Sequence, residues 1–394
     1  MVRFSRMSSR RPERCFHHAL GLCALLVLLY SCQAATQRPG RVNAAATGMH
    51  FLNLTLPGRS EHAPIVVDAS GSDVVVARVA YVDGLREVQV LRQLGGEWDF
   101  LGDRGRALTG GDGSFLRDAV KGPDGRLWIL AGYARPSNPQ RGPRNYLYCL
   151  EDGRWRTKGP PTGSVVPGLA DLGLHFLGEN EPVHHYLEFD ATGTGEALPC
   201  LVQLKGDTWA EHPGQQLLRR VGGLIAWRSR DAWLIAAERI EGSILLRSYH
   251  LKGPGAYDIG GPHALLEVPE NVRLGKVAAS QQGQIAVLVY RADGDRLTGW
   301  ITSLDDDSAR EIVSIPGHPG PSEIDAIVWS PTGELLSVTT DPARDSVAVW
   351  ALRQGEWRNI AEAEQHTRGR LFGPRLYARP DGTPIVTWED FYTR

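Results

Sequence analysis

The chain has 394 residues, of which 42% are hydrophobic and 22% charged, and its formal net charge at pH 7 is −2. This near-neutral balance without a basic run argues against nucleic-acid binding, which needs cations gathered on one face. The length would suit two or three ordinary domains, but ring-shaped β folds of this size can form a single unit.

The N-terminal residues have the pattern of an export signal. Five arginines lie between Arg3 and Arg14, and an apolar run follows from Ala19 to Tyr30. A basic region before about a dozen apolar residues is typical of a signal peptide and is short for a membrane span. We expect residues 1–31 to be a signal peptide, with an uncleaved membrane anchor as the alternative.

The stretch Leu29-Tyr-Ser-Cys32 resembles the bacterial lipobox, in which a Leu three places before a Cys, and a small residue just before it, mark that Cys for acylation. The resemblance implies a lipoprotein that is anchored through Cys32 and faces the periplasm or the cell exterior, since several acyl chains hold a domain firmly at a bilayer. Cleavage after Ala34 or Ala35 is the alternative. Residues 32–48 would be the lipidated Cys and a flexible tether.

Removal of residues 1–31 would leave 38 basic and 44 acidic side chains. Such an acidic domain would contact the membrane through the lipid anchor only.

A turn motif recurs seven times along the rest of the chain. Its clearest copy is Gly122-Pro-Asp-Gly-Arg-Leu-Trp128, a short turn between two apolar runs, which predicts a hairpin because these turn residues tolerate unusual backbone angles. The other copies begin at Asp68, Gly178, Arg228, Ser280, Ser330 and Arg379.

A second hairpin motif, a turn followed by an aromatic or apolar residue, comes after each of the first six copies. Its instances are Gly96–Trp98, Gly153–Trp155, Gly206–Trp209, Gly255–Tyr257, 307–312 and Gly355–Trp357. Each unit therefore has four strands, and an interval of about 50 residues is typical of a β-propeller blade. We expect the aromatic residue to pack between blades.

These repeats predict an all-β fold, a seven-bladed β-propeller over residues 49–394, or six blades if the third or fourth copy is spurious. The seventh copy lacks its second hairpin because the chain reaches Arg394 first. The run Met49–Leu56 is expected to supply an outer strand to the last blade and so to remove an exposed edge. We expect no amphipathic helix from Pro64 onward.

Cys149 and Cys200 are the only thiols in the predicted propeller, and an oxidising compartment would permit a disulfide. Cys149 lies four residues before Gly153 and Cys200 six before Gly206, and these even offsets place both thiols on the same face of their sheets. Because adjacent blades meet through opposite faces, buried free thiols are favoured over a disulfide.

Two acidic or histidine-rich stretches suggest metals at first sight. In a strand, His184, Tyr186 and Glu188 share one side and His185 points the other way, which leaves fewer than the three ligands of a catalytic zinc. The run 305–307 is three aspartates in a turn without the spacing of a calcium loop. We predict no metal and no cofactor.

Ligands of propellers generally sit over the central channel, which the loops after the second strand of each blade surround. Aromatic, cationic and acidic side chains at those ends would suit a sugar or a peptide; solvated strand ends are the alternative. The candidates are Tyr133, Arg135, Glu238, Arg239, Arg291, Asp293, Asp341, Glu389 and Asp390.

The stretch from Gly122 to Trp128 resembles the repeat of streptogramin B lyases and of sensor-type periplasmic propellers, in which a Gly-Pro-Asp-Gly turn precedes a Leu-Trp strand. Arg379–Gly382 matches in part. The catalytic histidine and metal-site residues of the lyase have no matching position, and the Asp-box of sialidases, which share the general layout, is absent. The resemblance implies architecture only.

We therefore expect a monomeric, exported propeller that binds a protein or glycan without catalysis. The alternative is a carbohydrate-active hydrolase or lyase that uses carboxylates such as Glu238, Asp293 and Glu389. Perturbed carboxylates in a deep pocket would favour the enzyme, and a shallow funnel the binding protein.

Overall fold

The computed structural model describes residues 52–53, 56, 63–103, 105, 107–110, 113–133, 144–164, 173–177, 181–188, 198–228, 231–251, 263–269, 272–291, 297–303, 309–312, 324–341, 346–364 and 369–392. The chain divides into two compact units, Met1–Arg41 and Val42–Arg394, and every described residue lies in the second unit. The predicted signal peptide, Cys32 and the tether therefore lie outside the described residues. No helix in the described ranges is long and apolar enough to cross a bilayer.

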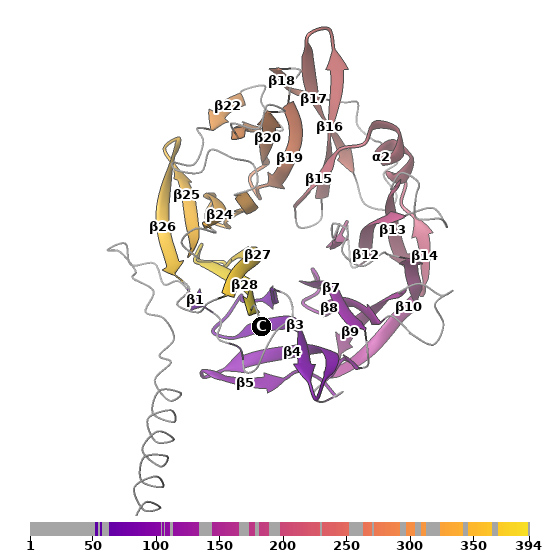
Figure 1. Cartoon of the computed structure of the whole chain (residues 1–394). Coiled ribbons are helices and arrows are strands. Elements are labelled where there is room, and N and C mark those ends of the chain that lie inside the picture. Colours follow the sequence, from indigo (N-terminus) through magenta and orange to yellow (C-terminus); the bar gives the residue numbers. More distant parts are fainter. Residues whose placement is uncertain are drawn as a thin grey trace, which may run out of the picture. The chain divides into compact units, whose positions relative to one another are not determined.

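Five sheets are meanders of four strands consecutive in sequence (Figure 1). The second sheet has β7 (Ser114–Lys121), β8 (Leu127–Tyr133), β9 (Arg144–Glu151) and β10 (Arg154–Ser164). The third has β11 (Leu174–Phe176), β12 (Pro182–Glu188), β13 (Leu198–Lys205) and β14 (Thr208–Glu211). The fourth has β15 (Leu224–Arg228), β16 (Asp231–Ile240), β17 (Ser243–Leu251) and β18 (His263–Pro269).

The fifth sheet has β19 (Val272–Ala279), β20 (Gln284–Arg291), β21 (Leu297–Ser303) and β22 (Ala309–Ile312). The sixth has β23 (Ile324–Trp329), β24 (Leu335–Asp341), β25 (Ser346–Arg353) and β26 (Glu356–Glu364).

Two further sheets are less regular. The first sheet has β2 (Ile65–Asp68), β3 (Val74–Val82), β4 (Leu85–Leu94) and β5 (Glu97–Phe100), and the short β6 (Thr109–Gly110) also pairs with β4. The last sheet has three strands, β27 (Gly369–Ala378), β28 (Pro384–Tyr392) and β1 (Leu52–Asn53).

Apolar clusters join each sheet to the next. Ile129 and Val90 belong to the cluster between the first and second sheets, and Trp128 and Phe176 to the one between the second and third. Further clusters continue this order up to the last sheet, whose Ile385 packs with Val76 of the first. This cyclic packing confirms the all-β propeller class. The five four-stranded sheets are blades of regular form, whereas the irregular first and last sheets leave the count of seven as a prediction.

The first motif forms the turn between the first two strands of a sheet. In the copies that begin at Gly122, Ser280, Ser330 and Arg379, the first residue donates its N–H to the carbonyl four residues later and accepts from the glycine three residues later. The φ angles of those glycines lie between 81° and 88°. Only glycine adopts this left-handed conformation at little cost, which explains why glycine recurs there.

The aromatic residues of the second motif pack against the preceding sheet, as predicted. Trp155 of the second sheet lies in the cluster between the first and second sheets, and its indole Nε1 donates to the Leu101 carbonyl at 2.8 Å. Trp357 of the sixth sheet packs in the same way against the fifth.

An N-terminal strand joins the last sheet, as predicted, and its direction is parallel to β28. Leu52 pairs with Ile385 and Asn53 with Val386, which places β1 on the outer side of β28. A parallel pairing needs no hairpin, because the two strands come from opposite ends of the chain. The Thr387 hydroxyl donates to the Pro64 carbonyl at 2.5 Å and also joins the two ends.

The expectation that no helix follows Pro64 is wrong. Helix α2 (Gln215–Val221) lies after β14 and buries Leu217 and Leu218 against the third and fourth sheets. Its seven residues make only two turns, too short for a helical period to stand out in the sequence. The Gln215 side chain bonds Leu201 N and the Pro199 carbonyl, so it covers the edge of β13 that β14 does not reach.

The predicted faces of the two thiols need a correction. In the third sheet the turn glycine is the first residue after the strand, whereas in the second sheet it is the second residue after it. Alignment on the glycine therefore shifted the register by one residue, and Cys149 and Cys200 point into the same space between the second and third sheets. Both are nevertheless buried free thiols, as favoured.

Candidate functional site

The sheets present two ends, which we call the turn face, where the first-motif turns lie, and the funnel face, where the second strands end. The second strands β8, β20, β24 and β28 end at or near the predicted residues Tyr133, Arg291, Asp341, Glu389 and Asp390, as expected. The side chains of these five residues, and the whole of Arg135 and Asp293, lie outside the described residues.

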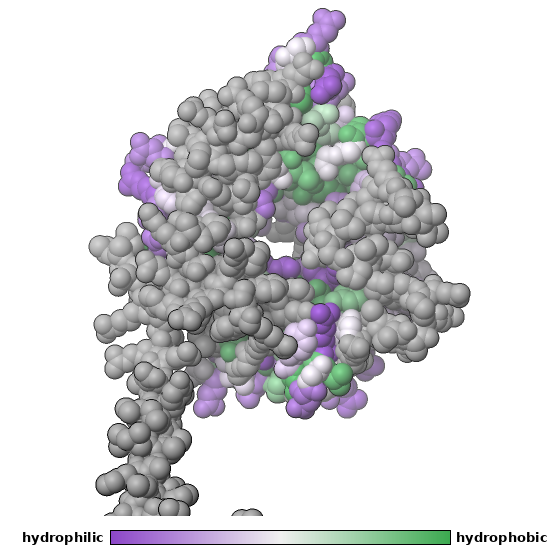
Figure 2. Space-filling view, viewed as in Figure 1, coloured by the Kyte–Doolittle hydropathy of each residue, from purple (hydrophilic) through white to green (hydrophobic). Residues whose placement is uncertain are grey.

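Glu238 and Arg239 are the two funnel-face candidates whose side chains are described. Both lie on β16 and are exposed, and Figure 2 shows hydrophilic residues over the tip of the β16–β17 hairpin. The Glu238 carboxylate pairs with the Arg247 guanidinium of β17 and is 53% exposed. Glu238 is therefore a solvated partner of Arg247 on the hairpin surface and is not enclosed in a pocket.

The described interior contains several polar residues near the funnel face. Ser114, Asn145, Ser243 and Ser346 are the first or second residues of strands that begin at this face, and all are buried. Thr109, just before β7, is also buried. The Ser243 hydroxyl donates to Glu267, whereas side-chain atoms of Thr109, Ser114 and Asn145 have no hydrogen-bond partner among the described residues. Buried polar groups cost free energy unless they are hydrogen-bonded, so these three residues point to a site at this end of the sheets.

Four polar residues lie on strands that border the space between the second and third sheets, and we call them the inter-sheet cluster: Arg117, Asn145, His184 and Tyr186. Asn145, Leu147 and Cys149 lie on the same side of β9, and Leu147 and Cys149 pack toward the third sheet. His184 pairs with Leu174 of β11, which packs toward the second sheet. Strand alternation thus directs both side chains into the same space.

Asp118 positions the two inner strands around this cluster. Its carboxylate accepts hydrogen bonds from the Leu174 N–H at 2.6 Å and from the Ala119 N–H at 2.8 Å, and so ties β7 to β11. The register of β7 shifts between Leu116 and Asp118. This bulge places Arg117 beside the cluster, and its guanidinium lies 4.6 Å from the Phe115 ring centroid.

His184 is neutral at physiological pH. Burial, together with nearby His185, Arg117 and His175, lowers its pKa to about 3. Its ring lies 4.8 Å from the Tyr186 ring and 6.3 Å from the Trp209 ring. A neutral imidazole provides one donor and one acceptor, whereas a pKa this low makes it a weak base for catalysis.

The Asn145 amide is the least satisfied group of the cluster. The residue is 1% exposed, and neither its Oδ1 nor its Nδ2 has a hydrogen-bond partner among the described residues. Tyr186, by contrast, is half-buried. A ligand with hydroxyl or amide groups could bond the Asn145 amide and stack beside the Tyr186 ring.

The sequence pattern singled out His184 and Tyr186 but missed Arg117 and Asn145. Nothing in the local sequence distinguishes them from other polar strand residues. Their distances from the turns would have placed them on the side of the second sheet that faces the third, but only if the position of each turn had been assigned correctly. Within the described ranges, no three His, Cys, Asp or Glu residues are close enough to hold a metal ion. The aspartates at 305–307 lie outside those ranges.

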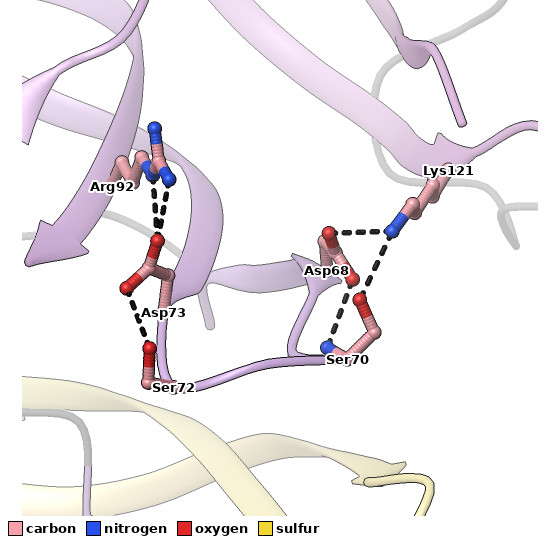
Figure 3. A network of polar contacts seen from close by, with 6 residues as sticks. All are labelled: Asp68, Ser70, Ser72, Asp73, Arg92 and Lys121. Carbon is pink, nitrogen blue, oxygen red and sulfur yellow. Dashed lines mark hydrogen bonds and ion pairs between the residues drawn. The ribbon is translucent and has the colours of Figure 1, made fainter.

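The turn face carries a different polar network, shown in Figure 3. The Lys121 ammonium donates to Asp68 at 2.8 Å and to Ser70 at 3.0 Å, and so joins the second sheet to the first. Arg92 and Asp73 form an ion pair at 2.5 Å within the first sheet. These contacts join charges of opposite sign at the surface and fix the turns in place.

Packing and topology therefore define a β-propeller protein with polar side chains in the space between its second and third sheets. No protein-family model and no curated protein matches the chain. Among solved structures, an oligogalacturonate lyase from Vibrio parahaemolyticus has a TM-score of 0.50 and 11% identity, covering 87% of this chain and 96% of that one. Prolyl oligopeptidase B from Galerina marginata has a TM-score of 0.50 and 9% identity, covering 86% and 49%.

The propeller domain of the Trilobed protease from Pyrococcus furiosus has a TM-score of 0.46 and 11% identity, and the match covers 83% of this chain and 95% of that one. The chain spans about half the length of the prolyl peptidases it matches, at 45% and 49%. The two matches with a TM-score of 0.50, at 11% and 9% identity, show the propeller fold alone.

Proposed function

We propose that this protein is a seven-bladed propeller that binds a polar ligand, a glycan or a peptide, at its funnel face without catalysing a reaction. The observation that carries the proposal is the buried Asn145 amide, which has no hydrogen-bond partner among the described residues and faces the same inter-sheet space as neutral His184 and half-buried Tyr186. Seven sheets, seven first-motif turns and a cyclic series of apolar clusters support the blade count.

The decisive experiment compares two matched variants of the intact protein. Asn145→Leu removes the amide of the inter-sheet cluster, and Gln203→Leu removes a fully buried amide, also without partners, on the opposite face of the third sheet. In an array of glycans and cell-wall fragments, we expect wild type and Gln203→Leu to bind the same compounds and Asn145→Leu to lose at least tenfold in affinity. Equal binding by all three would refute the site.

The alternative is a carbohydrate-active lyase or hydrolase. Arg117 could hold a sugar carboxylate, and the Tyr186 phenol could donate a proton to a leaving oxygen. This alternative gains weight if the protein forms unsaturated products from uronate polymers, followed by ultraviolet absorbance, and if Tyr186→Phe stops their formation while binding persists. Binding without turnover in the same assay supports the non-catalytic function.

We further propose that the protein is exported and anchored through Cys32, with the membrane contacted by the lipid alone and the propeller monomeric. The support is the sequence pattern of residues 1–32. In a bacterial host, Cys32→Ala should move the protein from the membrane to the soluble fraction, while Cys23→Ala, in the apolar run, should leave it membrane-bound. An unchanged membrane fraction for Cys32→Ala contradicts the anchor and leaves the ligand site untouched.

A further inference from the structure

An arginine lies buried between the first and last sheets. Arg78 is in the middle of β3 and is 4% exposed. Val74 and Val76 lie on the same side of the strand and pack against Ile385 of the last sheet, so strand alternation directs Arg78 toward the last sheet as well.

Among the described residues, the guanidinium of Arg78 has one hydrogen-bond partner. Its Nε and Nη2 donate to Oε1 of Gln89, the residue directly opposite on β4, at 3.1 and 2.9 Å. Its Nη1 has no hydrogen-bond partner, and no carboxylate among the described residues forms an ion pair with it. Glu87 is connected to Arg78 only through Gln89, because its Oε2 accepts a hydrogen bond from Gln89 Nε2 at 3.2 Å.

A buried charge without a counter-ion is expensive, and folded proteins usually supply one. Burial disfavours the charged form of Arg78 and lowers its pKa, but a guanidinium remains protonated throughout the physiological range. The amide oxygen of Gln89 solvates two of the N–H groups and brings no charge. One donor nitrogen, Nη1, is therefore left without an acceptor among the described residues.

We propose that Arg78 binds a small monovalent anion, of the size of chloride or formate, through Nη1 at the contact between the first and last sheets. The site is small because Arg78 is almost fully enclosed. One negative charge fits because the Glu87 carboxylate, linked through Gln89, would repel a second.

This position gives the anion a structural effect. The first and last sheets hold the two ends of the propeller together, and Thr387, on the side of β28 that carries Ile385, already bonds the Pro64 carbonyl. An anion that binds only the folded protein stabilises it in proportion to the logarithm of its concentration. The proposal is independent of the ligand at the inter-sheet cluster.

The test measures thermal unfolding of the intact protein in sodium chloride or sodium formate, against the sodium salt of a bulky buffer sulfonate at equal ionic strength. We expect both small anions to raise Tm by about 2–4 °C, and Arg78→Met to abolish the difference. Arg92→Met, which removes a partly exposed arginine of the same sheet, is the matched control and should retain it.

Line broadening of the chloride NMR signal gives a second readout that does not depend on the variant's stability. Broadening by the wild type that formate reverses supports the site. An equal Tm in all three salts, or the same salt response in Arg78→Met and wild type, overturns the proposal and leaves a water molecule as the partner of Nη1.

Discussion

The turn face and the funnel face of the sheets are built in contrasting ways. On the turn face, four copies of one motif repeat the same backbone hydrogen bonds and the same glycine φ angle. At the funnel face the connections differ from sheet to sheet, one of them contains helix α2, and polar groups such as Asn145 are buried. Repetition at one end thus fixes how the sheets pack, and variation at the other leaves room for a specific ligand.

The largest expected effect concerns packing near the turn face. Trp155→Ala should lower the free energy of unfolding by about 3–5 kcal/mol, because a large buried side chain leaves a cavity between the first and second sheets. Trp155→Phe should cost less, since it keeps much of the packing and loses the hydrogen bond to the Leu101 carbonyl. Urea unfolding measures both. A loss below about 1 kcal/mol for the alanine variant would contradict inter-sheet packing by this residue.

The second prediction concerns the acid sensitivity of the third sheet. Burial lowers the pKa of His184 to about 3, so as pH falls below about 6.5 the unfolded chain takes up a proton that the folded protein does not. Stability should therefore decrease from about pH 6.5 toward pH 4, by about 1.4 kcal/mol per pH unit from this residue.

Burial also lowers the pKa values of His185 and His212 to about 4, so they add to the same trend. His184→Asn should flatten the pH dependence of urea unfolding between pH 7 and 5 without removing it. A variant slope equal to that of the wild type would mean that His184 is solvated in solution.

The third prediction separates backbone strain from steric contact in the repeated turns. Gly382 and Gly125 have φ angles of 85° and 81°, so alanine at either position should cost roughly 1–2 kcal/mol. A Cβ at Gly382 would also lie 2.8 Å from Oγ1 of Thr332, whereas nothing lies within 4 Å of one at Gly125. Gly382→Ala should be the more destabilising of the two in parallel urea titrations. The reverse order would show that the last turn relaxes freely.

The smallest expected effect concerns the surface network of Figure 3. Burial raises the pKa of Asp68, but the hydrogen bonds from Lys121 and Ser70 together lower it by more. The net result is a lowered pKa. The resulting stabilisation is present above the ordinary pKa of 3.8 and disappears as pH falls through the lower folded value.

Because the Lys121–Asp68 pair is partly exposed, Lys121→Met should cost only about 0.2–1 kcal/mol at pH 7. The difference from wild type should shrink in high salt, which screens exposed charges. An undiminished difference at high salt would indicate that packing of the lysine stem, and not its charge, provides the stability.

Local sequence predicted much of the fold. The seven first-motif copies all fall between the first two strands of a sheet, and the strand at 52–53 joins the last sheet. Local sequence failed where a single residue decides the register. The turn glycine occupies a different position beside Cys149 than beside Cys200, and that shift places the two thiols on opposite faces of their sheets and not on the same face.

For the site, the sequence identified strand ends but not partners. It named His184 and Tyr186 through their spacing, yet gave no sign that Asn145 or Arg117 lies across from them. The buried Arg78 was equally inconspicuous, because a lone arginine in an apolar strand has no periodic signal. Its importance comes from its enclosure by residues more than 300 positions away, such as Ile385.

The sequence by itself determined the recurring hairpins, because turn residues and alternating apolar residues act over a few neighbours. The tertiary structure decided which polar side chains share an enclosed space, the parallel direction of β1 and the packing of helix α2. Those features depend on contacts between sheets. A register shift of one residue moves every side chain of a strand to the other face of its sheet, and no local pattern fixes that register.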